Sequence, residues 1–413
     1  MNKTIKTIIF AAAVALFSCA FAASKKSIVC ATYPEYDWVM NILGDKAASF
    51  NVTLLQNNGT DLHSYQASIK DIAKISVCDM LVFVGGESDE WVEKAVAEAK
   101  NKNMIVVNMM EYLGDKVKEE EIVEGMQAEE EDEHEHEHAD HDDDQDHKGH
   151  HHHHDEVEYD EHVWLSLRNA AALVQTLAQK ISELDSANAA AYKANAAAYS
   201  KSILDLDAQY KAAVAAAAKK TILFGDRFPF RYLADDYNLK YYAAFVGCSA
   251  ETEASFETVI FLAKKVDELG LNAVLTIEKS DKKIAKTIVS NTKKKSAEIL
   301  EMDSLQSITP KDIKAGRSYL SAMKKNLEVL KKALRESNDA VSFPRASRES
   351  IKNKETMHEK NIFRNRGAIL CGAFCPGSAR SSLCVAASKN VSRPKNRLGL
   401  YQNEFQHGKR PCL

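Results

Sequence analysis

Short apolar segments alternate with amphipathic ones on both sides of the centre of the chain. In the first half, strands are predicted at 27–32, 51–55, 80–84 and 104–108, and helices at about 35–43 and 91–100. In the second half, strands are predicted at 221–224, 241–245, 273–277 and 297–300, and helices at about 253–269, 281–293 and 311–334. Such alternation indicates βαβ units and parallel sheets. We therefore expect two α/β lobes, over residues 27–184 and 220–334.

An alanine-rich segment without glycine, from about 167 to 220, separates the two blocks. Alanine is the best helix former, and the only predicted break is at Asp185-Ser186, a good N-cap pair. The part from 187 to 219 is predicted as one long, rigid linking helix. One face should pack, because five apolar or aromatic residues recur at helical spacing: Tyr192, Tyr199, Ile203, Leu206 and Tyr210.

The two ends of the 413-residue chain differ from this pattern. Lys3 and Lys6 precede an apolar run and then small residues, which predicts a signal peptide over residues 1–22 and export. Cleavage after Ala22 competes with a lipobox ending at Cys19, which would make the protein a lipoprotein. Residues 335–413 carry fifteen Lys/Arg and six Asp/Glu and show no amphipathic period. We expect a disordered or anomalous tail without assigned function.

Residues 127–158 contain ten of the fourteen histidines and are densely acidic. Without apolar periodicity this stretch cannot bury a core, so a mobile acidic, His-rich loop is predicted. Its imidazoles could capture metal loosely, as an accessory to a defined site. The candidates are His134, His136, His138, His141, His147, His150, His151, His152, His153 and His154.

Three of the eight cysteines, Cys30, Cys78 and Cys248, lie in the part predicted to fold. Their spacing suggests no disulfide framework, and we interpret them as buried thiols. None of the predicted helices carries a His-Glu-x-x-His motif, and the sequence has no Gly-x-Ser-x-Gly or phosphate-binding Gly-x4-Gly-Lys motif. The folded part is acidic, which argues against nucleic-acid binding.

Four polar residues lie where predicted strands or helices end: His63, His162, Asp226 and Asp303. Ligands gather at such ends in α/β proteins. Each residue alone has a structural explanation, as a surface histidine or a helix cap. Together, two residues from each lobe supply nitrogen and oxygen donors for a four-coordinate divalent metal. We predict that the metal lies in the cleft between the lobes.

Four motifs resemble those of the metal-binding receptors of bacterial ABC importers for zinc and manganese. They are Thr32-Tyr33-Pro34, Asp61-Leu62-His63, Asp160-Glu161-His162-Val163-Trp164-Leu165 and Asp303-Ser304-Leu305. Their order and spacing match that family over about residues 27–334, and the His-rich insertion is typical of its zinc branch. The resemblance implies two similar lobes bridged by a long helix, with one metal in the cleft. It also implies docking on a membrane permease that is powered by a cytoplasmic ATPase.

One position departs from the family pattern. The third ligand of the family, a His or Glu, lies five residues before the tyrosine that is Tyr232 here, and that position holds Arg227. A guanidinium cannot ligate a cation. Asp226 could take the role while Arg227 turns away or pairs with a second carboxylate, and a loop histidine could do so instead. Two His and two carboxylates suit Mn²⁺ as well as Zn²⁺, whereas the imidazole-rich loop favours zinc.

The resulting hypothesis is an exported, monomeric receptor, in the periplasm or lipid-anchored outside the cytoplasmic membrane. It binds zinc, with manganese as the alternative, and passes it to an ABC permease without enzymatic chemistry. A zinc hydrolase would need an open coordination position and a general base, which no motif supplies. The second alternative is a metal buffer or adhesin that acts through the His-rich loop.

Overall fold

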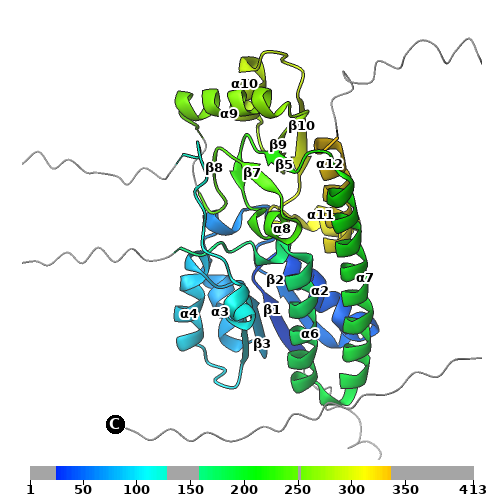
Figure 1. Cartoon of the computed structure of the whole chain (residues 1–413). Coiled ribbons are helices and arrows are strands. Elements are labelled where there is room, and N and C mark those ends of the chain that lie inside the picture. The colour runs from blue at the N-terminus through cyan, green and yellow to red at the C-terminus, as the bar shows by residue number, and fades with distance from the viewer. Residues whose placement is uncertain (1–24, 128–157, 250–252, 336–413) are drawn as a thin grey trace, which may run out of the picture. The chain divides into compact units, whose positions relative to one another are not determined.

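A computed structural model describes residues 25–127, 158–249 and 253–335 (Figure 1). The expected signal peptide, nearly all of the His-rich loop and the basic tail lie outside these described residues. None of the helices in the described ranges is long and apolar enough to cross a membrane. The rest of the fold follows the predicted two-lobe arrangement.

The N-terminal lobe contains one sheet of four parallel strands in the order β2-β1-β3-β4. Its strands are β1 (Lys26–Cys30), β2 (Phe50–Leu54), β3 (Met80–Phe83) and β4 (Ile105–Asn108). Its helices are α2 (Tyr33–Leu43), α3 (Ile69–Val77), α4 (Glu90–Ala97) and α5 (Met109–Leu113). Alternate residues of β1 belong to different core clusters, so both faces of the sheet are covered. The expected parallel sheet is confirmed.

The C-terminal lobe repeats this strand order. Parallel pairs β7-β5 and β9-β10 are connected by a parallel bridge from Phe224 to Leu275, which gives β7-β5-β9-β10. The strands are β5 (Thr221–Leu223), β7 (Lys240–Tyr242), β9 (Ala273–Ile277) and β10 (Glu298–Met302), and a separate pair is formed by β6 (Arg227–Phe228) and β8 (Phe245–Val246). The helices are α8 (Arg231–Tyr237), α9 (Phe256–Leu269), α10 (Lys283–Asn291), α11 (Pro310–Lys314) and α12 (Tyr319–Ala333).

Two consecutive helices connect the lobes, and the break between them lies at the predicted position, Asp185-Ser186. Helix α6 (Leu167–Leu184) is followed by α7 (Ala189–Ala216), and the turn between them is held by Asp185, which accepts hydrogen bonds from Tyr192 and Asn188. At 1.5 Å per residue, α7 is about 42 Å long. It packs against α2 and α6 of the first lobe and against α8 and α12 of the second (Figure 1). The bridging helix is therefore confirmed.

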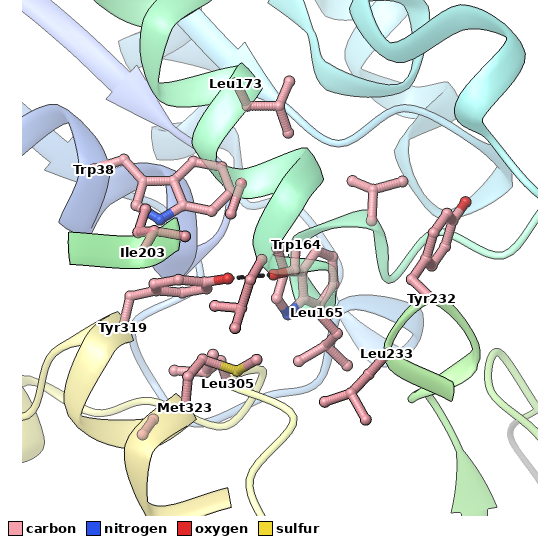
Figure 2. Close-up of a cluster of buried hydrophobic side chains, with 14 of the residues drawn as sticks. Trp38, Trp164, Leu165, Leu173, Ile203, Tyr232, Leu233, Leu305, Tyr319 and Met323 are labelled. Atoms are coloured by element: carbon pink, nitrogen blue, oxygen red, sulfur yellow. Dashed lines mark hydrogen bonds between the residues drawn. The ribbon is translucent and has the colours of Figure 1, made fainter. Parts of the chain in front are cut away.

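A buried cluster lies where these elements meet (Figure 2). Its labelled members are Trp38, Trp164, Leu165, Leu173, Ile203, Tyr232, Leu233, Leu305, Tyr319 and Met323. Trp164 is central, because its indole N–H donates to the Ser304 carbonyl at 2.8 Å and its own carbonyl accepts from the Tyr319 hydroxyl at 2.7 Å. These bonds tie the segment that contains His162 to the second lobe.

Candidate metal centre

His63 lies in a short 3-10 turn, η2 (Leu62–Ser64), in the loop that follows β2. The Asp61 side chain caps this turn by accepting the His63 backbone N–H at 3.1 Å. Around the imidazole, Nδ1 lies 2.9 Å from the Ser88 hydroxyl and 3.4 Å from Glu161 Oε2. In the tautomer that carries its proton on Nδ1, the imidazole donates to the Ser88 hydroxyl. The lone pair of Nε2 is then available to a metal.

His162 lies just before the 3-10 turn η5 (Val163–Leu165), and its side chain is fully buried. Asp160 Oδ1 accepts two hydrogen bonds from it, from the backbone N–H at 2.8 Å and from Nδ1 at 3.0 Å. Because a carboxylate only accepts, the proton lies on Nδ1 and the lone pair on Nε2. A carboxylate behind an imidazole is the usual support of a metal-binding histidine.

The two imidazoles approach each other through their Nε2 atoms. His63 Nε2 lies 3.2 Å from His162 Nε2. Two nitrogens bound to one tetrahedral zinc at about 2.0–2.1 Å would be about 3.3 Å apart. Lone pairs that face each other at this distance repel unless a proton or a metal ion lies between them. The pair is therefore arranged for a shared cation.

The electrostatics of the two rings differ. Burial, and then the nearby His162, lower the pKa of His63 to about 3. Burial also acts to lower the pKa of His162, but the Asp160 carboxylate outweighs it, so that pKa is raised. His63 is thus a neutral imidazole at physiological pH, which is the form that binds metal.

Cys248 is the third donor beside the pair, and the interpretation as an ordinary buried thiol missed this. Each of the three side chains His63, His162 and Cys248 offers one potential ligand atom, and these atoms lie within 4.8 Å of one another. Among the described residues, this is the one group of three or more His, Cys, Asp or Glu side chains that could hold a metal ion. Cys248 follows β8 and Gly247, and its backbone N–H donates to Glu120 at 3.1 Å. Burial, and then Asp160 and Glu120, raise the pKa of the thiol. The signal that could have placed Cys248 near the histidines is the pairing of β6 with β8, and these strands have only two residues each.

Arg227 pairs with a carboxylate, as one of the two sequence-based alternatives proposes. Its Nη2 lies 2.7 Å from Asp61 Oδ2, and its Nη1 donates to the Ser249 carbonyl at 3.0 Å. Asp226 accepts the Arg227 backbone N–H at 3.0 Å, and burial raises the pKa of the Asp226 carboxyl. The structure does not bring Asp226 into the group with the two histidines.

The loop after β10 places Asp303 against Arg317 instead of against the imidazoles. The Asp303 carboxylate also caps its own loop by accepting the Leu305 N–H at 2.9 Å. From the same loop, Gln306 approaches the pair, with its amide nitrogen 3.0 Å from His162 Nε2 and its amide oxygen accepting the Leu62 N–H at 3.4 Å. Sequence reasoning did not single out Gln306, whose residue type carries no metal signal.

The comparisons with known proteins agree with this architecture. The family described as "Zinc-uptake complex component A periplasmic" matches residues 28–333, and the chain belongs to this family. The zinc-binding lipoprotein AdcA of Streptococcus pneumoniae is 30% identical over 325 residues, which cover 79% of this chain and 59% of AdcA. The high-affinity zinc uptake system protein ZnuA of Bacillus subtilis is 28% identical over 310 residues, covering 75% and 88%.

A solved structure shows the same fold. The Zn(II)-bound ZnuA-like domain of Streptococcus pneumoniae AdcA superposes with a TM-score of 0.57 at 26% identity and covers 76% of this chain and all of that domain. The chain spans only a little more than half the length of the streptococcal relatives, 56% of AdcA from Streptococcus pyogenes. The similarity therefore concerns the two-lobed part of the chain.

Proposed function

We propose that this protein is an exported receptor that captures one zinc ion between its lobes and delivers it to an ABC permease. The observation that carries the proposal is the 3.2 Å separation of His63 Nε2 and His162 Nε2, with the opposite nitrogen of each ring held by an oxygen acceptor. The family and its zinc-binding relatives support zinc as the cargo. Imidazole donors also favour zinc over manganese, which prefers oxygen.

Capture and release need no covalent chemistry on a substrate, so we propose a receptor and not an enzyme. The zinc would pass to a membrane permease driven by a cytoplasmic ATPase, with the receptor acting as a monomer. Asp226 and Asp303 remain predicted ligands. Asp303 would first have to leave Arg317, and Asp226 would have to turn from the backbone that it caps.

The test is the metal content of a variant in which residues 128–157 are replaced by a Gly/Ser linker. Gln127 stays, because its N–H donates to the Ala244 carbonyl at 2.9 Å and its side chain accepts the Ser255 N–H. After exposure to equal Zn²⁺ and Mn²⁺ and dialysis, elemental analysis should find one zinc per chain. His63→Ala and His162→Ala should each lose it, and His358→Ala in the tail should not. Retention of zinc by both cleft variants would refute the site.

Transport needs a separate measurement. A strain that lacks the protein should grow poorly on limiting zinc and recover with excess zinc. Restoration by the full chain but not by the His63→Ala chain would link import to the cleft. Unimpaired growth of the deletion strain would contradict the import role and favour a metal buffer or adhesin.

A further inference from the structure

The position of Cys248 beside the two histidines raises the question of whether its sulfur is a third ligand. A tetrahedral zinc with a bond of about 2.3 Å to sulfur and about 2.05 Å to nitrogen separates those two atoms by about 3.6 Å. The donor atoms of Cys248 and the two histidines lie within 4.8 Å of one another in the structure. A movement of about 1.2 Å or less, within the range of a side-chain adjustment, would bring the sulfur to the separation of about 3.6 Å from a ring nitrogen that a shared zinc ion requires.

The backbone around Cys248 is fixed from both sides. Its own N–H is held by Glu120, and the carbonyl of the next residue, Ser249, is held by Arg227. On the other side, Gly247 packs directly on the His162 ring, where an added Cβ would lie 3.1 Å from Cε1. The loop thus approaches the His162 ring closely at Gly247, and the next residue, Cys248, has its sulfur within 4.8 Å of a His162 ring nitrogen.

The charges explain why a cysteine suits this chain. Arg227 brings a permanent positive charge to the position where the sequence resemblance implies a third ligand. Its guanidinium is bound to Asp61 at 2.7 Å, so that carboxylate is committed to the arginine. The two imidazoles, as neutral ligands, bring no negative charge to the zinc ion. A thiolate would supply one negative charge and a soft donor at the same time.

We propose that Cys248 is the third zinc ligand of this receptor, so that the cleft binds zinc through two histidines and one cysteine in place of the two predicted carboxylates, Asp226 and Asp303. The inference rests on the proposed function and names a third ligand for its site. As the Zn–S bond forms, the S–H bond of Cys248 breaks and its proton passes to solvent, without any oxidation or reduction. One proton is released per zinc bound by this thiol. Such a donor set also excludes manganese more strongly than one with two carboxylates.

Cobalt substitution tests the inference directly in the full chain, kept reduced with a non-thiol reductant. Cobalt(II) bound to a thiolate shows a near-ultraviolet charge-transfer band that imidazole and carboxylate ligands do not give. At one cobalt per chain, the wild type should show the band and Cys248→Ser should lose it. Zinc affinity, measured by competition with a chromophoric chelator, should fall by at least about 10–100-fold in Cys248→Ser, because even residues behind a metal ligand have effects of this size.

Two matched controls separate the role of Cys248 from general effects of losing a thiol. Cys30→Ser and Cys78→Ser remove buried free cysteines of the N-terminal lobe and should keep both the band and the affinity. Cys248→His should recover zinc affinity without the charge-transfer band, which shows that the variants fold and that a ligand is needed at this position. The tail cysteines are the same in every variant.

The outcomes distinguish this inference from the proposed function. If His63→Ala abolishes zinc binding while Cys248→Ser keeps both the wild-type affinity and the band, the third-ligand inference is wrong and the receptor function stands. If His63→Ala also binds zinc as the wild type does, the cleft site itself is wrong. Loss of band and affinity in both variants supports the two-histidine, one-cysteine site.

Discussion

Asp160 should control zinc affinity although it is not proposed to touch the metal. Its Oδ1 accepts both the backbone N–H and the Nδ1–H of His162, at 2.8 and 3.0 Å, and so sets the tautomer and orientation of a fully buried ring. Asp160→Ala removes the acceptor of both hydrogen bonds. Loss of such a supporting carboxylate costs about 10–100-fold in metal affinity, which is about 1.4–2.7 kcal/mol of binding free energy.

The assay is chelator competition at neutral pH, with the loop replaced so that its histidines do not contribute. Asp160→Asn keeps an oxygen acceptor but loses the charge, so its affinity should fall between those of wild type and Asp160→Ala. Asp37→Asn is the matched control, because this buried carboxylate accepts the Tyr199 hydroxyl at 2.6 Å in a different part of the core. It should change stability and leave zinc affinity unchanged. Affinity of Asp160→Ala within twofold of wild type would refute the reasoning.

Three further predictions concern packing, stability and pH. Gly247→Ala should weaken zinc binding at least about fivefold, since overpacking costs about 1–3 kcal/mol and the new Cβ would lie 3.0 Å from the Phe228 carbonyl oxygen and 3.1 Å from the His162 ring. Wild-type affinity in the chelator titration would show that the ring has room. Tyr319→Phe should lower the free energy of unfolding by about 1–3 kcal/mol, because the buried Trp164 carbonyl loses its donor, and urea unfolding without added metal measures this. Partial burial acts to raise the pKa of Asp71, but hydrogen bonds at the helix N-cap outweigh it and lower this pKa from 3.8 to about 2. The stabilisation from the Asp71 charge is complete above pH 3.8 and disappears as the pH falls towards 2, so the difference in urea midpoint between wild type and Asp71→Asn should shrink over that range. A difference in urea midpoint that stays constant over this pH range would contradict the assignment of the lowered pKa to Asp71.

The fold could be predicted well because its elements are long enough to show a period. Strand β9 runs over the predicted residues 273–277, and the long helix begins and ends within three residues of its predicted bounds. The predicted break at Asp185 is real, since its carboxylate organises the turn. The β6 and β8 strands were missed as a pair, because two residues cannot display a periodic pattern.

The candidate site was predictable only where local sequence determines local structure. His63 and His162 each follow an aspartate by two residues, and in both cases that aspartate accepts the backbone N–H of the histidine. The surroundings of Asp303 depend on Arg317, which the chain brings back fourteen residues later. The position of Cys248 depends on strand pairing across the lobe. The Asp303–Arg317 contact and the β6–β8 pairing cannot be predicted from the residues next to Asp303 and Cys248 in the sequence.

Helix α7 restricts how far the two lobes can move relative to each other. It packs on α2 and α6 at one end and on α8 and α12 at the other, so a wide rotation of the lobes would have to separate several packed helices at once. We therefore expect zinc to enter and leave through small local displacements of the loops around Cys248 and Gln306, without a large hinge motion. Loop motions are commonly faster than domain rotations. Under the proposed function, the residence time of the zinc ion would depend on its ligands, and a permease would obtain the zinc by displacing those loops.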